Sequence, residues 1–347
     1  MSVLDKIKKN SSIKDAAILA ESKFFTEKDM VSTAVPAMNI ALGGSLDGGI
    51  TPGLNTWAGP SKHFKTGLCL LMAMAYMKKY PEAVLLFYDS EFGTPQSYFK
   101  SFDIDMHRVW HTPIKNIEEF KFDLMQQLEN LDRGDKVIII VDSVGNLASK
   151  KEVDDAIDKK SVADMTRAKA LKSLYRMITP YLVMLDIPMH QVNHTYKTHE
   201  MFAKDVMSGG QGPYLSSDNI YFVGRQQDKD KKTNEIRGYN FIVTIEKSRH
   251  VKEKSKIPLE VLFEGGINKW SGLMDMALES GHVVKPKQGW YAKVDQETGE
   301  ISDKNFRLAD TNSKEFWNSI LEDQKFKDYV TKKYRLVSEN SILEDDE

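Results

Sequence analysis

The sequence predicts an α/β fold, with a mostly parallel sheet, helices on both of its faces and antiparallel hairpins at one edge. In the first part of the chain, short apolar runs alternate with helical segments, which is typical of a parallel sheet. These runs span residues 54–58, 84–88, 137–141 and 187–192. Later runs follow one another with no helix between them, which predicts the hairpins. They span residues 219–223, 239–245 and 258–263.

Length, charge and cysteine content narrow the class of protein. A chain of 347 residues suits one large domain with additions, or two domains. The formal net charge of −2 gives no overall attraction to nucleic acid, so contacts with DNA must come from local clusters. The single cysteine, Cys69, excludes an internal disulfide and fits a reducing compartment. The N-terminus lacks the apolar region of a signal peptide, so we expect a cytoplasmic protein with no membrane partner.

The chain begins with a helical pattern rich in Lys and Glu over residues 1–30. Phe24 and Phe25 exceed what one short helix can bury, so they must dock on a core, either of this subunit or of a neighbour. A Gly/Pro-rich loop at 41–53 leads into the first strand.

The first apolar run is followed by a glycine-led basic loop and then by an apolar helix. This order predicts a phosphate cradle, in which backbone N–H groups at a helix N-terminus bind a nucleoside triphosphate. Lys65 would supply a point charge to the β- and γ-phosphates, and the Thr66 hydroxyl suits Mg²⁺. Phe64 stands where the G-x-x-x-x-G-K-[ST] pattern has its second glycine, so the loop must differ locally. The predicted nucleotide-binding residues are Gly59, Pro60, Ser61, Lys62, His63, Phe64, Lys65, Thr66 and Gly67. The alternative is an ordinary surface turn.

Carboxylates follow two of the predicted strands. Asp142 ends the run Val-Ile-Ile-Ile-Val, and paired with Lys65–Thr66 it is a candidate to hold Mg²⁺ through water. Asp89 and Glu91 lie just beyond another strand, and Glu91 is our candidate for the base that orients and deprotonates a water. The alternative for each is a solvated acid or a turn cap at a strand end.

The pattern of predicted elements changes after Gly265-Gly266. A helix at 273–280, a hairpin centred on Trp290 and a helical stretch at 313–334 predict a small C-terminal α+β domain over 269–337. Residues 338–347 form an acidic tail.

Several motifs together resemble the RecA-type homologous recombinases. These are Ala-Leu-Gly-Gly at 41–44, Gly-Pro-Ser at 59–61, Asp-Ser-Glu at 89–91 and Val-Asp-Ser-Val-Gly-Asn-Leu at 141–147. Residues 64–66, 88–93, 146–152 and 193–196 match a phage branch of that family, which shares the departure at Phe64. The resemblance covers nearly the whole chain. It implies a RecA-like P-loop ATPase core over 33–268 and an N-terminal oligomerisation arm over 1–32.

The resemblance also implies roles for individual residues. Glu91 matches the catalytic glutamate, and Tyr98 the tyrosine that stacks on adenine, although a core aromatic is the alternative. His194 takes the place of a glutamine that senses the γ-phosphate, although a turn-forming histidine is equally compatible. Lys247 and Arg249 match two cations presented to a neighbour's ATP, where they would stabilise transition-state charge. A solvated basic edge strand is their alternative.

Two segments match the DNA-binding loops of the family. The first runs from about 149 to 160, and Arg167 on the following helix aligns with a DNA-phosphate contact, although Lys169 and Lys172 nearby could equally form a solvated face. The second runs from about 195 to 213 and is expected to lack regular structure, which suggests function. Its candidate DNA-binding residues are Lys197, Phe202, Lys204, Gly209 and Gly210. The alternative is a surface flap without function.

The resemblance implies an ATP-dependent DNA strand-exchange recombinase with ATP and Mg²⁺ as cofactors. It would form helical filaments on single-stranded DNA, pair them with homologous duplex, and work with single-strand-binding and mediator proteins. A hexameric helicase on the same core and a weakly hydrolysing ATP-gated adaptor are the alternatives.

Overall fold

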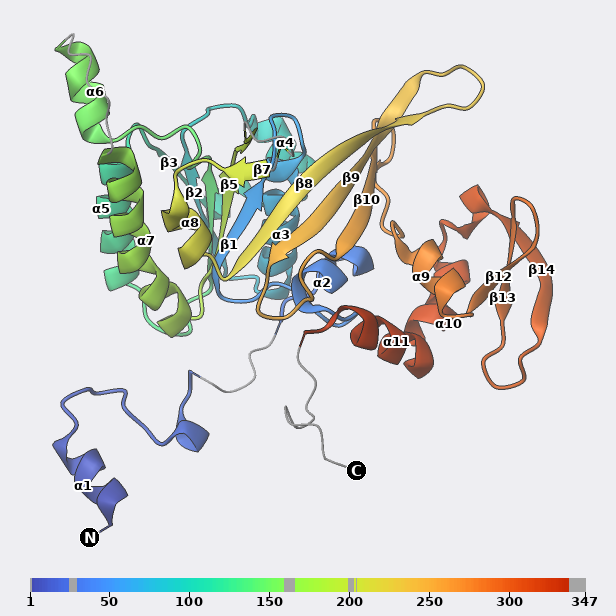
Figure 1. The fold of residues 1–347 in the computed structure, drawn as a ribbon, viewed down its shortest axis with the longest axis horizontal. Helices are drawn as coiled ribbons and strands as arrows, with labels where there is room; N and C mark the ends of the chain where they lie inside the picture. The colour runs from blue at the N-terminus through green and yellow to red at the C-terminus, as the bar shows by residue number, and fades with distance from the viewer. Residues whose placement is uncertain (1, 25–29, 159–165, 199–202, 204, 337–347) are drawn as a thin grey trace.

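The computed structural model describes residues 2–24, 30–158, 166–198, 203 and 205–336. Within these residues, nine strands form one sheet in the order β11-β10-β9-β8-β1-β5-β4-β2-β3. Figure 1 shows this sheet with helices packed on both sides and a small second lobe beside it. The predicted α/β fold class is therefore confirmed. No helix in the described part of the chain is long and apolar enough to span a membrane.

The middle of the sheet is parallel. Its strands are β1 (Gly53–Ala58), β2 (Val84–Asp89), β3 (Val109–Pro113), β4 (Val137–Asp142) and β5 (Pro188–Asn193). The sequence analysis did not predict β3. This strand lies at the sheet edge with Trp110 exposed, so it lacks the continuous apolar run that marks a buried parallel strand.

The other edge is antiparallel, as predicted. β8 (Asn219–Lys229) pairs parallel with β1, and β9 (Ile236–Lys247), β10 (Lys256–Leu262) and β11 (Gly266–Ile267) follow it in antiparallel order. β8 and β9 extend beyond the other strands as a projecting ribbon (Figure 1).

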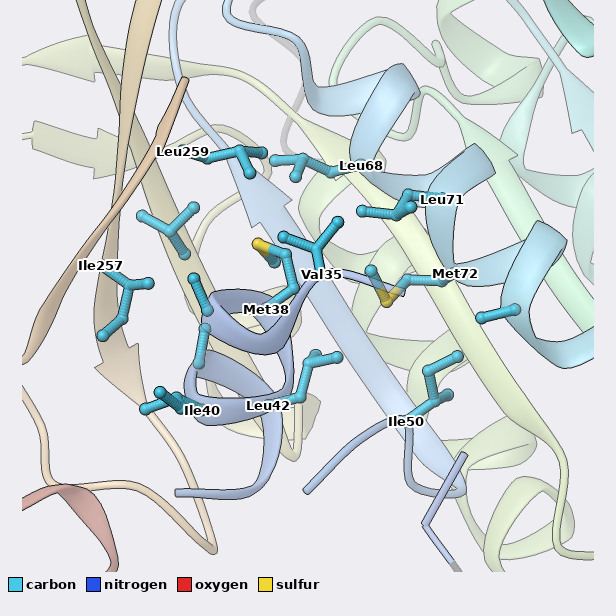
Figure 2. Packing of buried hydrophobic residues seen from close by; sticks show 14 of the residues in the cluster. Val35, Met38, Ile40, Leu42, Ile50, Leu68, Leu71, Met72, Ile257 and Leu259 are labelled. Atoms are coloured by element: carbon cyan, nitrogen blue, oxygen red, sulfur yellow. The ribbon is translucent and has the colours of Figure 1, made fainter. Parts of the chain in front are cut away.

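Buried side chains gather on both faces of the sheet because successive residues of a strand point to opposite sides. Ile138 and Ile140 of β4 join the core under α2 (Pro36–Gly43) and α3 (Lys65–Lys79). Ile139 and Val141 join the core under α5 (Ile117–Glu129) and α7 (Thr166–Met184). Figure 2 shows the first core, where Met38 of α2, Leu68 of α3 and Leu259 of β10 point toward one another.

The C-terminal lobe has its own small sheet, and its helix–hairpin–helix order agrees with the sequence. Its elements are α9 (Leu273–Glu279), β12 (Val283–Lys287), β13 (Trp290–Val294), β14 (Ile301–Arg307), η3 (Leu308–Thr311), α10 (Lys314–Glu322) and α11 (Gln324–Tyr334). Phe316, Trp317 and Phe326 are buried within it. The remaining short elements are α1 (Val3–Asn10), η1 (Leu19–Glu21), α4 (Gln96–Ser101) and η2 (Met106–Arg108).

Both predicted DNA-binding loops contain regular structure, which corrects the expectation for the second. Residues 149–160 include α6 (Lys150–Ile157), where the Ser149 hydroxyl accepts a hydrogen bond from the Glu152 amide. α6 buries no side chain, so its sequence shows no core-facing stripe. Residues 195–213 include the paired strands β6 (Thr195–Lys197) and β7 (Asp205–Met207) and the start of α8 (Gln211–Ser216). The helix start expected at 161–164 lies outside the described residues.

Candidate active site

The phosphate loop joins the end of β1 to the start of α3, as predicted. The Lys65 side chain is 5 % exposed, and its Nζ donates a hydrogen bond to the carbonyl of Pro60 at 2.7 Å. The ammonium group is thus folded back over its own loop. This position places its charge where the cradle would receive the β- and γ-phosphates.

Phe64 is accommodated by a left-handed backbone and an aromatic partner. Its φ is 58°, a conformation that glycine adopts without strain and other residues rarely do. The ring stacks on Phe241 of β9, with centroids 5.2 Å apart and planes at 21°. A side chain at Gly67 would place its Cβ 2.5 Å from the Phe64 ring and 2.7 Å from the Tyr98 hydroxyl. A larger residue at position 67 would therefore displace one or both of these rings, which crowd the first turn of α3.

Thr66 and Asp142 meet as the metal prediction requires. The Thr66 hydroxyl donates to Asp142 Oδ2 at 2.7 Å, whereas Asp142 Oδ1 is buried and finds no hydrogen-bond partner among the described residues. Burial raises the pKa of Asp142 to about 6. An unpartnered buried carboxylate oxygen beside a hydroxyl fits Mg²⁺, which takes oxygen ligands and would compensate the buried charge.

The buried Asp142 makes a pH-dependent contribution to stability. The rise of its pKa from 3.8 to about 6 corresponds to about 3 kcal/mol. Because the folded state favours the protonated acid, this penalty is absent below the unfolded pKa and grows to its full size as pH passes the folded pKa. We expect Asp142→Asn to raise the free energy of unfolding at pH 7.5 by up to about 3 kcal/mol without Mg²⁺ and nucleotide, and by about half as much at pH 5. Urea unfolding of both proteins at the two pH values measures this, and a gain that does not change with pH would contradict it.

Glu91 accepts several hydrogen bonds at one oxygen. Its Oε1 is bound by the Ser143 hydroxyl at 2.5 Å, by Asn146 Nδ2 at 3.1 Å and by His194 Nε2 at 3.0 Å. The hydrogen bond from His194 and then that from Ser143 lower the pKa of Glu91, despite the opposing effect of burial. Glu91 is therefore an ionised carboxylate at neutral pH, which a general base must be.

Asp89 positions Glu91 rather than facing the cleft with it. The Asp89 side chain is buried, and its Oδ1 accepts hydrogen bonds from the backbone amides of Glu91 and Phe92. These contacts fix the turn that follows β2. β2 and β4 are neighbours with Asp89 opposite Asp142, so this turn lies beside the metal-site candidate.

One cleft of about 490 Å³ brings most of the predicted residues together. Predicted residues that line it are Ser61, Lys62, His63, Phe64, Lys65, Thr66, Gly67, Glu91, Tyr98, Asp142 and His194. Tyr98 is partly buried, which raises its pKa to about 12, so its hydroxyl is neutral.

The sequence analysis missed a further wall of the same cleft. Arg225, Tyr239, Phe241 and Phe263 line it from β8, β9 and the residue after β10. Tyr239 and Phe241 are two residues apart and share a strand face, which is the signal that could have identified them. The Arg225 guanidinium lies over the Tyr239 ring at 4.7 Å.

Lys247 and Arg249 are not among the residues that line this cleft. Arg249 follows β9, where its amide donates to Asn219 at the first position of β8, and its Nε donates to Asp218 at 2.7 Å. β8 runs parallel to β1, so Arg249 lies toward the amino end of these strands, whereas the phosphate loop follows the carboxyl end of β1. Lys247 Nζ donates to the carbonyls of Tyr214, Leu215 and Ser217 at the end of α8.

The DNA-binding candidates are held by local contacts. Arg167 donates to the carbonyls of Val144, Gly145 and Leu147, so it braces the segment that carries Asn146. Lys197 forms an exposed ion pair with Asp205 at 3.0 Å. Gly209 and Gly210 have φ of 94° and 74° at the start of α8, a left-handed geometry that suits glycine. Phe202, Lys204 and the arm residue Phe25 lie outside the described residues.

Comparisons with known proteins identify the family. A family model described as the RecA N-terminal domain matches residues 1–268, and one for the C-terminal domain of the bacteriophage T4 recombination and repair protein matches residues 270–330. The recombination and repair protein of Enterobacteria phage T4, UvsX, is 50 % identical over 97 % of this chain and 87 % of its own length.

Two more distant relatives point to the same family. The chloroplastic DNA repair protein recA homolog 1 of Arabidopsis thaliana is 24 % identical over 88 % of this chain and 65 % of its own length. Protein RecA of Mycoplasma mycoides is 26 % identical over 70 % of this chain and 68 % of its own length. The predicted resemblance to the phage branch is confirmed, and neither the helicase nor the adaptor alternative is favoured. The chain belongs to the RecA family and is a RecA-type recombinase.

Proposed function

We propose that this recombinase is a single-stranded-DNA-dependent ATPase that forms helical filaments and exchanges strands with homologous duplex. The observation that carries the proposal is the meeting of Glu91, Lys65 and the Thr66–Asp142 pair in one cleft. These are the parts that phosphoryl transfer to water requires: a group that orients the nucleophile, a cation for the phosphates and oxygen ligands for a metal.

Each residue has a distinct task in this reaction. Glu91 orients a water in line with the γ-phosphate and accepts its proton at the carboxylate. Lys65 binds the β- and γ-phosphates and holds the triphosphate in the cradle, while Tyr98 stacks on the adenine. Thr66 and Asp142 would hold Mg²⁺, which neutralises charge on the phosphates when bound.

Lys247 and Arg249 would act on the nucleotide of a neighbouring protomer. Their place toward the amino end of the parallel strands keeps them out of their own cleft. A site completed by the opposite end of a second copy is a head-to-tail contact, and repetition of such a contact generates an open helix. The proposed oligomerisation arm over residues 1–32 would strengthen the same contact.

His194 would connect hydrolysis to DNA. Its Nε2 faces Glu91, while its carbonyl accepts a hydrogen bond from the Ser208 amide just beyond β7 at 2.9 Å. β6 begins at the next residue, so one short segment contacts the catalytic carboxylate and continues into the proposed DNA-binding hairpin. Loss of the γ-phosphate would therefore alter how this hairpin is held.

Lys197 offers a direct test of the DNA-binding proposal. Its side chain is exposed and only ion-paired, so Lys197→Ala is expected to leave the fold intact. If Lys197 neutralises one phosphate of single-stranded DNA, the variant should bind more weakly, and the slope of log K against log salt should become shallower by about 0.7. Fluorescence titration of a labelled oligonucleotide across salt concentrations measures this. An unchanged slope would remove Lys197 from the interface.

The remaining expectations complete the proposal. The domain limits would be 33–268 for the ATPase core and 269–337 for the C-terminal domain, while the acidic tail over 338–347 lies outside the described residues. ATP, Mg²⁺, single-stranded DNA and homologous duplex are the proposed ligands. Single-strand-binding and mediator proteins are the proposed partners, in the cytoplasm of the host cell.

Joint-molecule formation tests the function as a whole. Circular single-stranded DNA and homologous linear duplex are incubated with the protein and Mg²⁺, with ATP and without it, and products are separated on a gel. Joint molecules that require both ATP and homology support the proposal. Unwinding of duplex without a homologous strand, or binding of DNA without exchange, would contradict it.

A further inference from the structure

We infer that Phe64 is a positioning residue that links the phosphate loop of one protomer to β9, the strand that ends at Lys247 and leads to Arg249, the two cations proposed to act on the neighbouring nucleotide. The inference rests on the proposed function, because it takes these cations to serve a second protomer. It adds a route between successive sites: the state of one phosphate loop sets the position of the cations at the next site.

The first contact in this route is the stack of Phe64 on Phe241. The two rings lie 5.2 Å apart and nearly parallel. Phe241 is 3 % exposed and belongs to the core, so its ring cannot shift without movement of its neighbours. Phe64 immediately precedes Lys65, the first residue of α3. A displacement of the loop upon nucleotide binding would therefore act on β9 directly.

A second contact joins the same loop to the same place on the ribbon. Arg225 Nη1 donates to the carbonyl of Lys62 at 3.0 Å. Arg225 of β8 and Phe241 of β9 are directly paired in the antiparallel register, so their side chains project from one face. One cross-strand pair thus holds two loop residues, Lys62 and Phe64, both of which have a left-handed backbone.

β9 can carry a displacement from Phe241 to Lys247. It is paired with β10 as far as Thr244 and with β8 along the whole length, although the β8 register shifts between Ile245 and Lys247. Val243 and Ile245, between the two positions, are fully buried. A strand paired on both sides and packed in this way shifts with its neighbours rather than bending alone. At about 3.3 Å per residue, it covers about 20 Å between Phe241 and Lys247.

The substitution that tests the link is suggested by the motif itself. Glycine, the usual residue here, adopts the same backbone conformation without a ring. Phe64→Gly therefore removes the contact with Phe241 and relieves the unfavourable φ of a bulky residue. We expect the variant to fold and to bind ATP. Thermal unfolding and titration with a fluorescent nucleotide check both properties.

Mixed filaments separate an effect on the neighbour's site from an effect on the protomer's own site. A reporter protomer carries Arg249→Ala, so it keeps its phosphate loop and Glu91. A donor protomer carries Glu91→Gln, so it binds ATP without hydrolysing it and supplies Lys247 and Arg249. Hydrolysis in the mixture then arises where a donor completes a reporter site.

Adding Phe64→Gly to the donor alone is expected to lower kcat of the mixture about 3- to 30-fold, with KM for ATP unchanged. Phe241→Leu in the donor should lower kcat by a similar factor. Both changes together should lower kcat no further than either one alone, because they break the same contact. Tyr80→Leu is the matched control. It removes a partly exposed ring that follows the far end of α3, and it should leave kcat unchanged.

The outcomes distinguish this inference from the function on which it rests. If the mixture hydrolyses ATP and donor Phe64→Gly changes nothing, the link is wrong while the cross-subunit site stands. Additive losses from Phe64→Gly and Phe241→Leu would also exclude a single link. A mixture no more active than its separate components would overturn the cross-subunit site, and the inference with it.

Discussion

Glu91→Gln is expected to reduce DNA-stimulated ATP hydrolysis by about 10²- to 10⁴-fold in kcat, the usual contribution of a general base. Glutamine keeps the size of the side chain and can accept hydrogen bonds from Ser143 and His194, but it cannot take a proton from water. The loss should therefore appear in kcat, with KM and nucleotide affinity nearly unchanged. Phosphate release in the presence of single-stranded DNA measures it.

Glu82→Gln is a matched control for this variant. Glu82 is exposed just before β2, whereas Glu91 follows the other end of the same strand, so both changes remove one carboxylate from the same part of the fold. The control should hydrolyse ATP at the wild-type rate. Equal phosphate release by wild type and Glu91→Gln would show that another group activates the water.

The hydrogen bonds around Glu91 show where sequence reasoning ends. The carboxyl ends of adjacent parallel strands meet at one edge of a sheet, so the approach of Glu91 to Asp142 could be predicted. One carboxylate oxygen of Glu91 accepts hydrogen bonds from Ser143, Asn146 and His194. This convergence depends on the directions of side chains in the turns that follow three strands. No periodic pattern of apolar residues in the sequence predicts these side-chain directions.

Phe64 illustrates the same limit. The sequence showed that the phosphate loop must depart from its usual geometry, but Phe241, the partner that accommodates the ring, belongs to a strand much later in the chain. The short elements α6 and β6–β7 were missed for a different reason. They bury few or no side chains, so neither the helical nor the strand pattern of apolar residues appears in them.

Arg249→Ala is expected to reduce hydrolysis on single-stranded DNA by about 10³-fold or more, as loss of a finger-type arginine does. The guanidinium would contact the transition-state charge of the neighbour's γ-phosphate, and lysine at the same place could not reproduce its bidentate geometry. In the isolated protomer the side chain is 72 % exposed and binds Asp218. Asp218 is buried, and it keeps the hydrogen bond from the Leu54 amide when the guanidinium is removed, so the variant should remain folded and bind nucleotide.

Lys256→Ala is the control that tests whether Arg249 acts on a nucleotide or is only one charge of a solvated basic edge. Lys256 is exposed at the start of β10, the strand next to β9, and its removal changes the net charge by the same amount. Phosphate release should fall in Arg249→Ala and stay at the wild-type rate in Lys256→Ala. Addition of Glu91→Gln protomers should then restore hydrolysis to Arg249→Ala, because the two defects lie on opposite sides of one nucleotide. Failure of this restoration would show that Arg249 does not complete the nucleotide site of a neighbouring protomer. Equal losses in Arg249→Ala and Lys256→Ala would show that Arg249 acts only as one charge of a solvated basic edge.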